Sequence, residues 1–173
     1  YMNTFSKSIL KFAFLGLLIF AFSCSKSDSN DTNETEDCDN FGPTSGSVVI
    51  NGVTYNAINQ YILTEDLGAY THVFQLAGVS SDCNELRALS FALINTSSSP
   101  AGTYPIKSFL GSTINTANGN YVVQKLSSAS QTALYMESGE LIIKVVGTKK
   151  FEINLNSVLT DQSNVSAKAT HQF

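Results

Sequence analysis

The pattern of hydrophobic and polar positions divides the chain into three parts. An unbroken apolar run, Phe12–Phe22, is followed by a polar stretch at 25–40, and short alternating segments then fill residues 41–173. The apolar run is shorter than the ~20 residues that a membrane-spanning helix needs. Because Lys7 and Lys11 precede it, its length and flanks are those of a secretory signal. We therefore predict a signal peptide at 1–23, a tether at 24–40 and one folded domain at 41–173.

Alternation of apolar and polar residues in the third part predicts strands. Val48–Ile50 and Val53–Ala57 flank Asn51-Gly52, a pair that favours the two-residue turn of a hairpin. Tyr70–Gly78 places Tyr70, His72, Phe74 and Leu76 on one face. Leu86–Asn95 begins with helix-forming residues, but its alternation fits a half-buried strand better.

The later segments follow the same rule. A short strand is expected at Gln60–Thr64, and a loop at 107–120. Ala133–Glu137 and Glu140–Val146 are expected as two strands joined by a turn at Ser138-Gly139. About nine or ten short strands without a long helical period predict an all-β domain, namely an antiparallel β-sandwich or a related barrel.

The end of the apolar run carries the first chemical signal. Ala21-Phe22-Ser23-Cys24 resembles the lipobox of bacterial lipoproteins, in which the cysteine is lipidated and becomes the mature N-terminus. The resemblance implies lipidation of Cys24 and attachment to a membrane through acyl chains. Two alternatives stay open, an ordinary signal cleaved near Ser23 and an uncleaved N-terminal anchor.

Charge separates the tether from the domain. Six acidic residues and Lys26 lie within 25–40, whereas 41–173 carry eight acidic and seven basic residues. A stretch this polar cannot bury enough surface to offset its ordering entropy, so a flexible spacer is expected. The near-neutral domain lacks the basic patch that nucleic-acid binding requires.

Three cysteines are present, and lipidation of Cys24 would leave Cys38 and Cys83. Compartments outside the inner membrane are oxidising, so we predict a Cys38–Cys83 disulfide between the tether and a polar loop of the domain. Two free thiols or intermolecular pairing are the alternatives.

The closing segments 138–143 and 149–155, together with Gly102-Thr103-Tyr104, resemble small Bacteroidota lipoproteins that carry a β-sandwich domain of unknown function. The resemblance covers most of 46–173 and rests on turns and core positions. It implies a place on the outer membrane, at the cell surface or on the periplasmic face. The acidic run near Asp28 resembles the export signal of some surface lipoproteins, and a plain solvated linker explains it equally well.

Candidate chemistry is sparse. His72 and His171 are the two histidines, and their positions in predicted strands favour structural roles over catalysis. Two histidines and two spare cysteines far apart do not make a zinc site. We therefore expect no enzyme activity, no metal and no cofactor.

Ligand binding is the remaining expectation. Five tyrosines could form a platform for a glycan, although strand tyrosines more often pack at the edge of a core with the hydroxyl in water. These residues are Tyr61, Tyr70, Tyr104, Tyr121 and Tyr135. The sequence thus predicts a non-catalytic envelope lipoprotein displayed for binding or for a structural role; the alternative is a glycan- or ligand-binding accessory module of an uptake system. Its expected partners are the membrane and a glycan or protein ligand.

Overall fold

The computed structural model describes residues 46–128 and 130–172, which lie in one compact unit. This part of the chain forms strands and one short 3-10 helix, and the all-β prediction is confirmed. The elements are β1 (Ser47–Ile50), β2 (Val53–Asp66), β3 (Ala69–Val79), β4 (Glu85–Asn95), β5 (Gly102–Lys107), η2 (Phe109–Gly111), β6 (Thr116–Lys125), β7 (Ser130–Gly147), β8 (Lys150–Leu159) and β9 (Asn164–Gln172).

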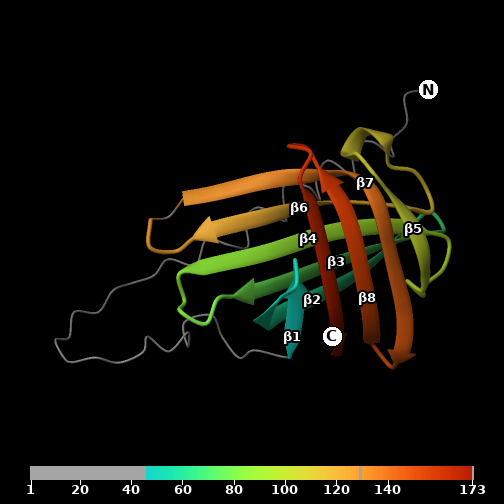
Figure 1. Ribbon diagram of the computed structural model, residues 1–173. Coiled ribbons are helices and arrows are strands. Elements are labelled where there is room, and N and C mark those ends of the chain that lie inside the picture. The colour runs from blue at the N-terminus through green and yellow to red at the C-terminus, as the bar shows by residue number, and fades with distance from the viewer. Residues whose placement is uncertain (1–45, 129, 173) are drawn as a thin grey trace. The chain divides into compact units, whose positions relative to one another are not determined.

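The nine described strands close into a ring. Their order is β1-β2-β3-β4-β6-β5-β7-β8-β9, and β1 closes the ring by pairing with both β2 and β9. In Figure 1, β6, β4 and β3 run side by side, and β8, β9 and the end of β7 cross them at a steep angle. The sheet is mixed, because β5 and β6 are parallel where Ile106 faces Ala117. The other pairings between the described strands are antiparallel, as expected for the predicted sandwich or related barrel.

Strand β7 belongs to both layers of the barrel. Its first half pairs with β6 and its second half with β5 and β8, and a register shift separates Met136 from Ser138. Gly139 follows this bulge with φ 131°, and a Cβ there would collide with the backbone oxygen of Asn156. Glycine is therefore required where the strand bends. The prediction of two strands and a turn at Ser138-Gly139 was wrong, because the chain bends here without ending the ladder.

The hairpin predicted at Asn51-Gly52 is confirmed, since both residues have positive φ between β1 and β2. Gln60–Thr64 is not a separate strand, because β2 continues unbroken from Val53 to Asp66 and pairs with β3 as far as Asp66. The strand at Leu86–Asn95 is confirmed as β4. The loop expected at 107–120 is shorter, because β6 already begins at Thr116.

The core fills the ring with the inward side chains of each strand. Phe74 and Phe91 stack with ring centroids 5.3 Å apart, and Phe151 packs edge-on against Phe74 at 5.6 Å. Full burial of side chains of this size stabilises the fold by about 1.5–3 kcal/mol each. His72, Phe74 and Leu76 share the inward face of β3, as their alternation predicted. Leu141 and Ile143 are buried on β7, whereas Val145 at the end of that strand is 46% exposed.

Candidate functional site

A buried polar network lies at the end of the barrel where β3 begins and β4 ends. Its centre is His72, which is fully buried on the inward face of β3. The Tyr61 hydroxyl lies 2.8 Å from His72 Nδ1. On the other side of the ring, His72 Nε2 lies 3.2 Å from Asn95 Oδ1 and 3.1 Å from the Ser97 carbonyl oxygen. The imidazole thus joins β2, β3 and β4 to the loop that follows β4.

These partners fix the protonation of His72. Both groups near Nε2 are acceptors, so Nε2 carries the proton and Nδ1 accepts the hydrogen bond of the Tyr61 hydroxyl. Burial lowers the pKa of His72, against the opposing effect of its hydrogen bonds to Ser97 and Asn95. Burial also raises the pKa of Tyr61. Both groups are therefore neutral around pH 7.

The same network holds the loop at 96–101 over this end of the barrel. Asn95 Nδ2 donates to the Ser99 carbonyl and to the Tyr104 hydroxyl, each at 3.0 Å. The Tyr104 hydroxyl in turn donates to the carbonyl of Pro100, at 3.1 Å. Gly102 has φ 155°, and a Cβ there would lie 2.9 Å from the Tyr104 hydroxyl. The Gly102-Thr103-Tyr104 element thus holds the end of this loop against Asn95 at its start.

The arrangement Tyr61–His72–Asn95 contains a hydroxyl, an imidazole and an orienting amide in line. Its geometry nevertheless suits structure better than catalysis. A general base must reach a proton of the substrate, but His72 has no exposed surface and each ring nitrogen is engaged by the barrel itself. The network satisfies buried polar groups that would otherwise destabilise the core.

The second histidine lies elsewhere in the interior. His171 is 7% exposed and faces inward on β9, opposite Phe151 of β8. Its Nδ1 lies near Gly46, where the described chain begins. The structure therefore does not bring the two histidines together into one site.

A polar cluster occupies the opposite end of the barrel. Arg87 faces inward on β4, forms an ion pair with Glu85, and lies 5.8 Å from the centre of the Tyr55 ring. Tyr121 packs nearby, and burial raises its pKa. Because Glu85 balances the Arg87 charge, this cluster is not a ready site for an anion.

The outward side of the β2-β3-β4-β6 layer and the first half of β7 has an unusual composition. Register places its side chains in five rows across the strands, and none of these positions carries a charge. We call this surface the uncharged face. Its rows are Asn56–Val79–Leu86–Gln124–Gln131, Ile58–Ala77–Ala88–Val122–Ala133, Gln60–Gln75–Ser90–Asn120–Tyr135, Ile62–Val73–Ala92–Asn118 and Thr64–Thr71–Ile94–Thr116.

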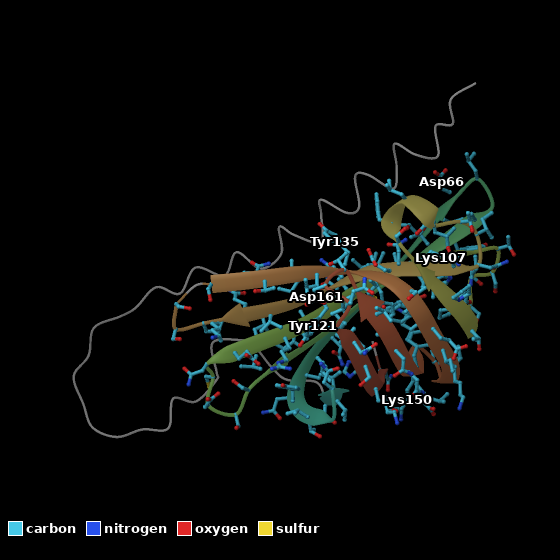
Figure 2. All side chains as sticks on the ribbon, turned by 45° about the horizontal axis from the view of Figure 1, so that its top comes forward. Asp66, Lys107, Tyr121, Tyr135, Lys150 and Asp161 are labelled. Atoms are coloured by element: carbon cyan, nitrogen blue, oxygen red, sulfur yellow. The ribbon has the colours of Figure 1, made fainter. Side chains whose placement is uncertain are left out.

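The third row is the most polar. It places three amides and a hydroxyl in line across four strands and ends at Tyr135, whose side chain is 57% exposed on β7 (Figure 2). Of the amides, Gln60 is exposed, Asn120 is half-buried and Gln75 is buried. Four strand spacings of ~4.8 Å give the row a length of about 19 Å. Amides and hydroxyls both donate and accept hydrogen bonds, and a half-exposed tyrosine offers an apolar ring with a polar tip.

The outward side of the other layer is different. Lys144 of β7 and Glu152 of β8 form an ion pair of 3.3 Å there. Lys168 of β9 faces Asn154 of β8 in the next row. This is the mixed, charged surface that solvent-facing strands ordinarily have. The contrast between the two layers marks the uncharged face as the best candidate for a functional surface.

The five tyrosines predicted as a platform do not share one surface. Tyr104 and Tyr121 are buried on the inward side, and Tyr61 packs between Phe74 and Phe151 in the core. Tyr70 is half-buried, which leaves Tyr135 as the exposed member. The platform prediction was therefore wrong as a group, because alternation turns Tyr61, Tyr104 and Tyr121 inward.

Sequence reasoning missed the amides. Asn95 is central to the His72 network, and the uncharged face depends on Gln60, Gln75 and Asn120. The absence of charge from every second position of four strands was the signal available in the sequence. Asn59 was missed too: its amide is buried in the wall of the barrel and makes no hydrogen bond within the described part of the chain.

Several predictions concern residues outside the described ranges. The signal peptide at 1–23, Cys24, the tether at 24–40 and Cys38 all lie there. Cys83 lies in the turn between β3 and β4, with φ 55°. Its disulfide with Cys38 stays a prediction.

Two features are absent from the described ranges, 46–128 and 130–172. No group of three or more His, Cys, Asp or Glu side chains within them could hold a metal ion. No helix formed by these residues has both the length and the apolar character needed to cross a membrane.

Comparison with known proteins adds no assignment. No family model matches the chain, no curated protein matches its sequence, and no solved structure matches its fold.

Proposed function

We propose that the protein is a lipid-anchored envelope protein whose barrel is a non-catalytic binding module. The ligand that suits it is uncharged and rich in hydroxyl groups, as neutral glycans are. One observation carries the proposal, namely that five rows of outward side chains contain no charge. The outward side of a strand layer normally carries Lys and Glu, as that of the β8–β9 layer does.

The polar row of the uncharged face supports the ligand class. Gln60 and Asn120 present amides that can donate to and accept from the hydroxyl groups of a sugar. Tyr135 adds an exposed ring at the end of the row. A charged ligand would find no opposite charge here, so its binding would lack the electrostatic attraction that commonly guides such partners.

The location rests on the N-terminal sequence. The apolar run, Cys24 and the acidic tether together support export, lipidation and display from the outer membrane, at the cell surface or on the periplasmic face. Each buried methylene of an acyl chain contributes about 0.8 kcal/mol, so two or more chains hold a protein durably. A Cys38–Cys83 disulfide belongs to the same proposal, because an exported domain folds under oxidising conditions.

Retention of the purified protein on neutral and acidic polysaccharides in affinity electrophoresis tests the proposal. We expect retardation by at least one neutral polysaccharide and at least a tenfold loss of affinity in Asn120→Lys, which puts a charge in the middle of the polar row. Asn154→Lys is the matched control, because it makes the same change on the outward side of β8. Equal effects of the two variants, or retention by acidic polymers alone, would refute the uncharged face as the binding surface.

A further inference from the structure

The turn between β2 and β3 carries an exposed leucine in a backbone conformation that leucine disfavours. Leu67 and Gly68 form a two-residue turn with φ 50° and 78°, and Asn51 and Gly52 form the turn between β1 and β2 with nearly the same angles, 51° and 80°. Asparagine and glycine are the usual residues in such turns, because a bulky side chain at positive φ is strained. Leu67 is 82% exposed, so burial within the barrel does not offset this strain. An exposed, strained side chain points to a contact outside the barrel.

Two further aliphatic side chains project from the loop between β5 and β6. Leu110 of η2 is 96% exposed and Ile114 is 47% exposed, and η2 buries none of its residues. Figure 2 shows Asp66, which precedes the β2–β3 turn, and Lys107, which precedes η2, at the same end of the barrel. This end therefore presents aliphatic side chains from two separate loops.

Strand pairing agrees with this placement. The start of β3, the end of β4 and the start of β6 lie together, because Ile94 pairs with Thr71 on one side and with Thr116 on the other. Leu67 and Ile114 each lie two residues before one of these strands. Two strand spacings, or about 10 Å, thus separate the turn from the second loop. We call Leu67, Leu110 and Ile114 the aliphatic tips.

The surroundings of the aliphatic tips are polar but carry few charges. Residues 62–71 and 105–118 contain two acidic side chains and one basic side chain, namely Glu65, Asp66 and Lys107. Ser108 and Thr113 add exposed hydroxyl groups on either side of η2. A surface for a strongly charged partner would carry more charge of one sign. Aliphatic side chains above a collar of hydroxyl groups suit the boundary between the head groups and the acyl chains of a bilayer.

From these observations we propose that this end of the barrel contacts a lipid bilayer, with the aliphatic tips inserted among the head groups. A bilayer accepts projecting side chains without a matching shape, whereas a protein partner would need a hollow for each tip. The lipid that suits the surface is zwitterionic, because anionic head groups would repel Glu65 and Asp66. The contact rests on the lipid anchor of the proposed function, which keeps the bilayer near, and not on the ligand.

The anchor permits this orientation. The described chain begins at Gly46, whose carbonyl accepts a hydrogen bond from the Ala57 amide. Nine residue steps of β2 lead from Ala57 to Asp66, which is about 30 Å of extended strand. Twenty-two residue steps separate Cys24 from Gly46 and span at most about 75 Å. The end that carries the aliphatic tips can therefore reach the bilayer that holds the acyl chains.

Fluorescence of the full-length lipidated protein in vesicles tests the contact. The chain contains no tryptophan, so Leu110→Trp supplies a single reporter at the aliphatic tips. We expect lipids brominated near the head groups to quench it at least twofold in vesicles of phosphatidylcholine and phosphatidylethanolamine. Val53→Trp is the matched control, because Val53 is 51% exposed at the opposite end of β2, and it should stay unquenched. Equal quenching of the two reporters would overturn the contact. Absence of quenching in Leu110→Trp would also overturn it, in favour of an apolar pocket in a partner protein.

Leu67→Asn separates the contact from folding. Asparagine suits the φ of this turn, so the variant should unfold at the wild-type temperature or above it. Added to Leu110→Trp, it should lower the quenching at least threefold, and undiminished quenching would overturn the insertion of Leu67. Replacing part of the zwitterionic lipid by an anionic lipid should also lower the quenching. Stronger quenching with anionic lipid would overturn the proposed lipid class.

The contact and the proposed function can fail separately. Flotation of the protein with vesicles reports on the lipid anchor, and polysaccharide retention in Asn120→Lys reports on the ligand. Flotation without quenching in Leu110→Trp would overturn the bilayer contact alone. A protein that does not float would overturn both the anchor and the contact.

Discussion

The Tyr61 hydroxyl and His72 Nδ1 meet at 2.8 Å inside the barrel, from positions 11 residues apart on adjacent strands. The hydroxyl donates because Nε2 already carries the imidazole proton toward Asn95 and Ser97. This hydrogen bond joins β2 to β3 in the half of their ladder nearer the Leu67-Gly68 turn, and it links the aromatic core to the loop that covers the barrel.

Removing the Tyr61 hydroxyl should therefore destabilise the barrel. Tyr61→Phe keeps the ring between Phe74 and Phe151 but leaves His72 Nδ1 buried without a donor. We expect a loss of about 1–3 kcal/mol in the free energy of unfolding, measured by urea denaturation. Tyr135→Phe is the control, since its exposed ring should change stability by less than about 0.5 kcal/mol. Equal stabilities of wild type and Tyr61→Phe would contradict the assigned tautomer, in which His72 Nδ1 accepts a hydrogen bond from Tyr61.

Stability should fall as the pH drops below about 6.5, the ordinary pKa of a histidine side chain in an unfolded chain. Burial lowers the pKa of folded His72, so the unfolded state takes up the proton first and is favoured as the solution becomes acidic. The stability that neutral His72 contributes to the folded state is fully present above about pH 6.5 and is lost as the pH falls through the pKa of folded His72. Urea unfolding of wild type and His72→Gln between about pH 7.5 and 5 measures it. If the free energy of unfolding of His72→Gln changed with pH as steeply as that of wild type, the pH dependence would belong to other groups.

Gly139 should not tolerate a side chain. Gly139→Ala combines a positive φ with a collision against the Asn156 backbone, so we expect a loss of about 2–4 kcal/mol. Gly52→Ala is the matched control, because Gly52 also has positive φ but no atom within 4 Å of an added Cβ. It should lose about 1 kcal/mol. Thermal unfolding of the two variants measures the difference, and similar losses would show that crowding at the β7 bulge is unimportant.

Lipidation can be tested independently of the barrel. Metabolic labelling with an acyl precursor should mark the wild-type protein and leave Cys24→Ala unlabelled. A lipoprotein signal-peptidase inhibitor should also block its processing. Cys83→Ala is the control and should remain labelled. Persistent labelling of Cys24→Ala would place the lipid elsewhere or favour one of the other two interpretations of the N-terminus.

The sequence predicted what depends on local pattern. Alternation alone placed His72, Phe74 and Leu76 on one face of a strand, and Asn51-Gly52 located the first hairpin. The ends of strands were harder to predict. The local sequence Ser138-Gly139 is typical of a turn, but in the structure it lies at a bulge and β7 continues through it. The decisive contact there, with Asn156, comes from another strand.

Long-range relations in the candidate site were also beyond local pattern. His72 and Asn95 are 23 positions apart, and their pairing depends on the β3–β4 register. The tyrosine platform failed for a different reason, because the five residues were grouped by type and composition does not say which way a side chain points. The uncharged face is an intermediate case. Its composition is visible in the sequence, but it becomes a surface only when the register aligns Gln60 with Gln75 and Asn120 with Tyr135.

Strand β1 is short, yet it is bonded on both edges, to β2 through Val48 and Tyr55 and to β9 through Val48 and Ala169. It is also the point at which the N-terminal segment enters the barrel. A pulling force on that segment therefore acts on two hydrogen-bond ladders at once, one to β2 and one to β9. Both ladders must break before β1 can leave the barrel.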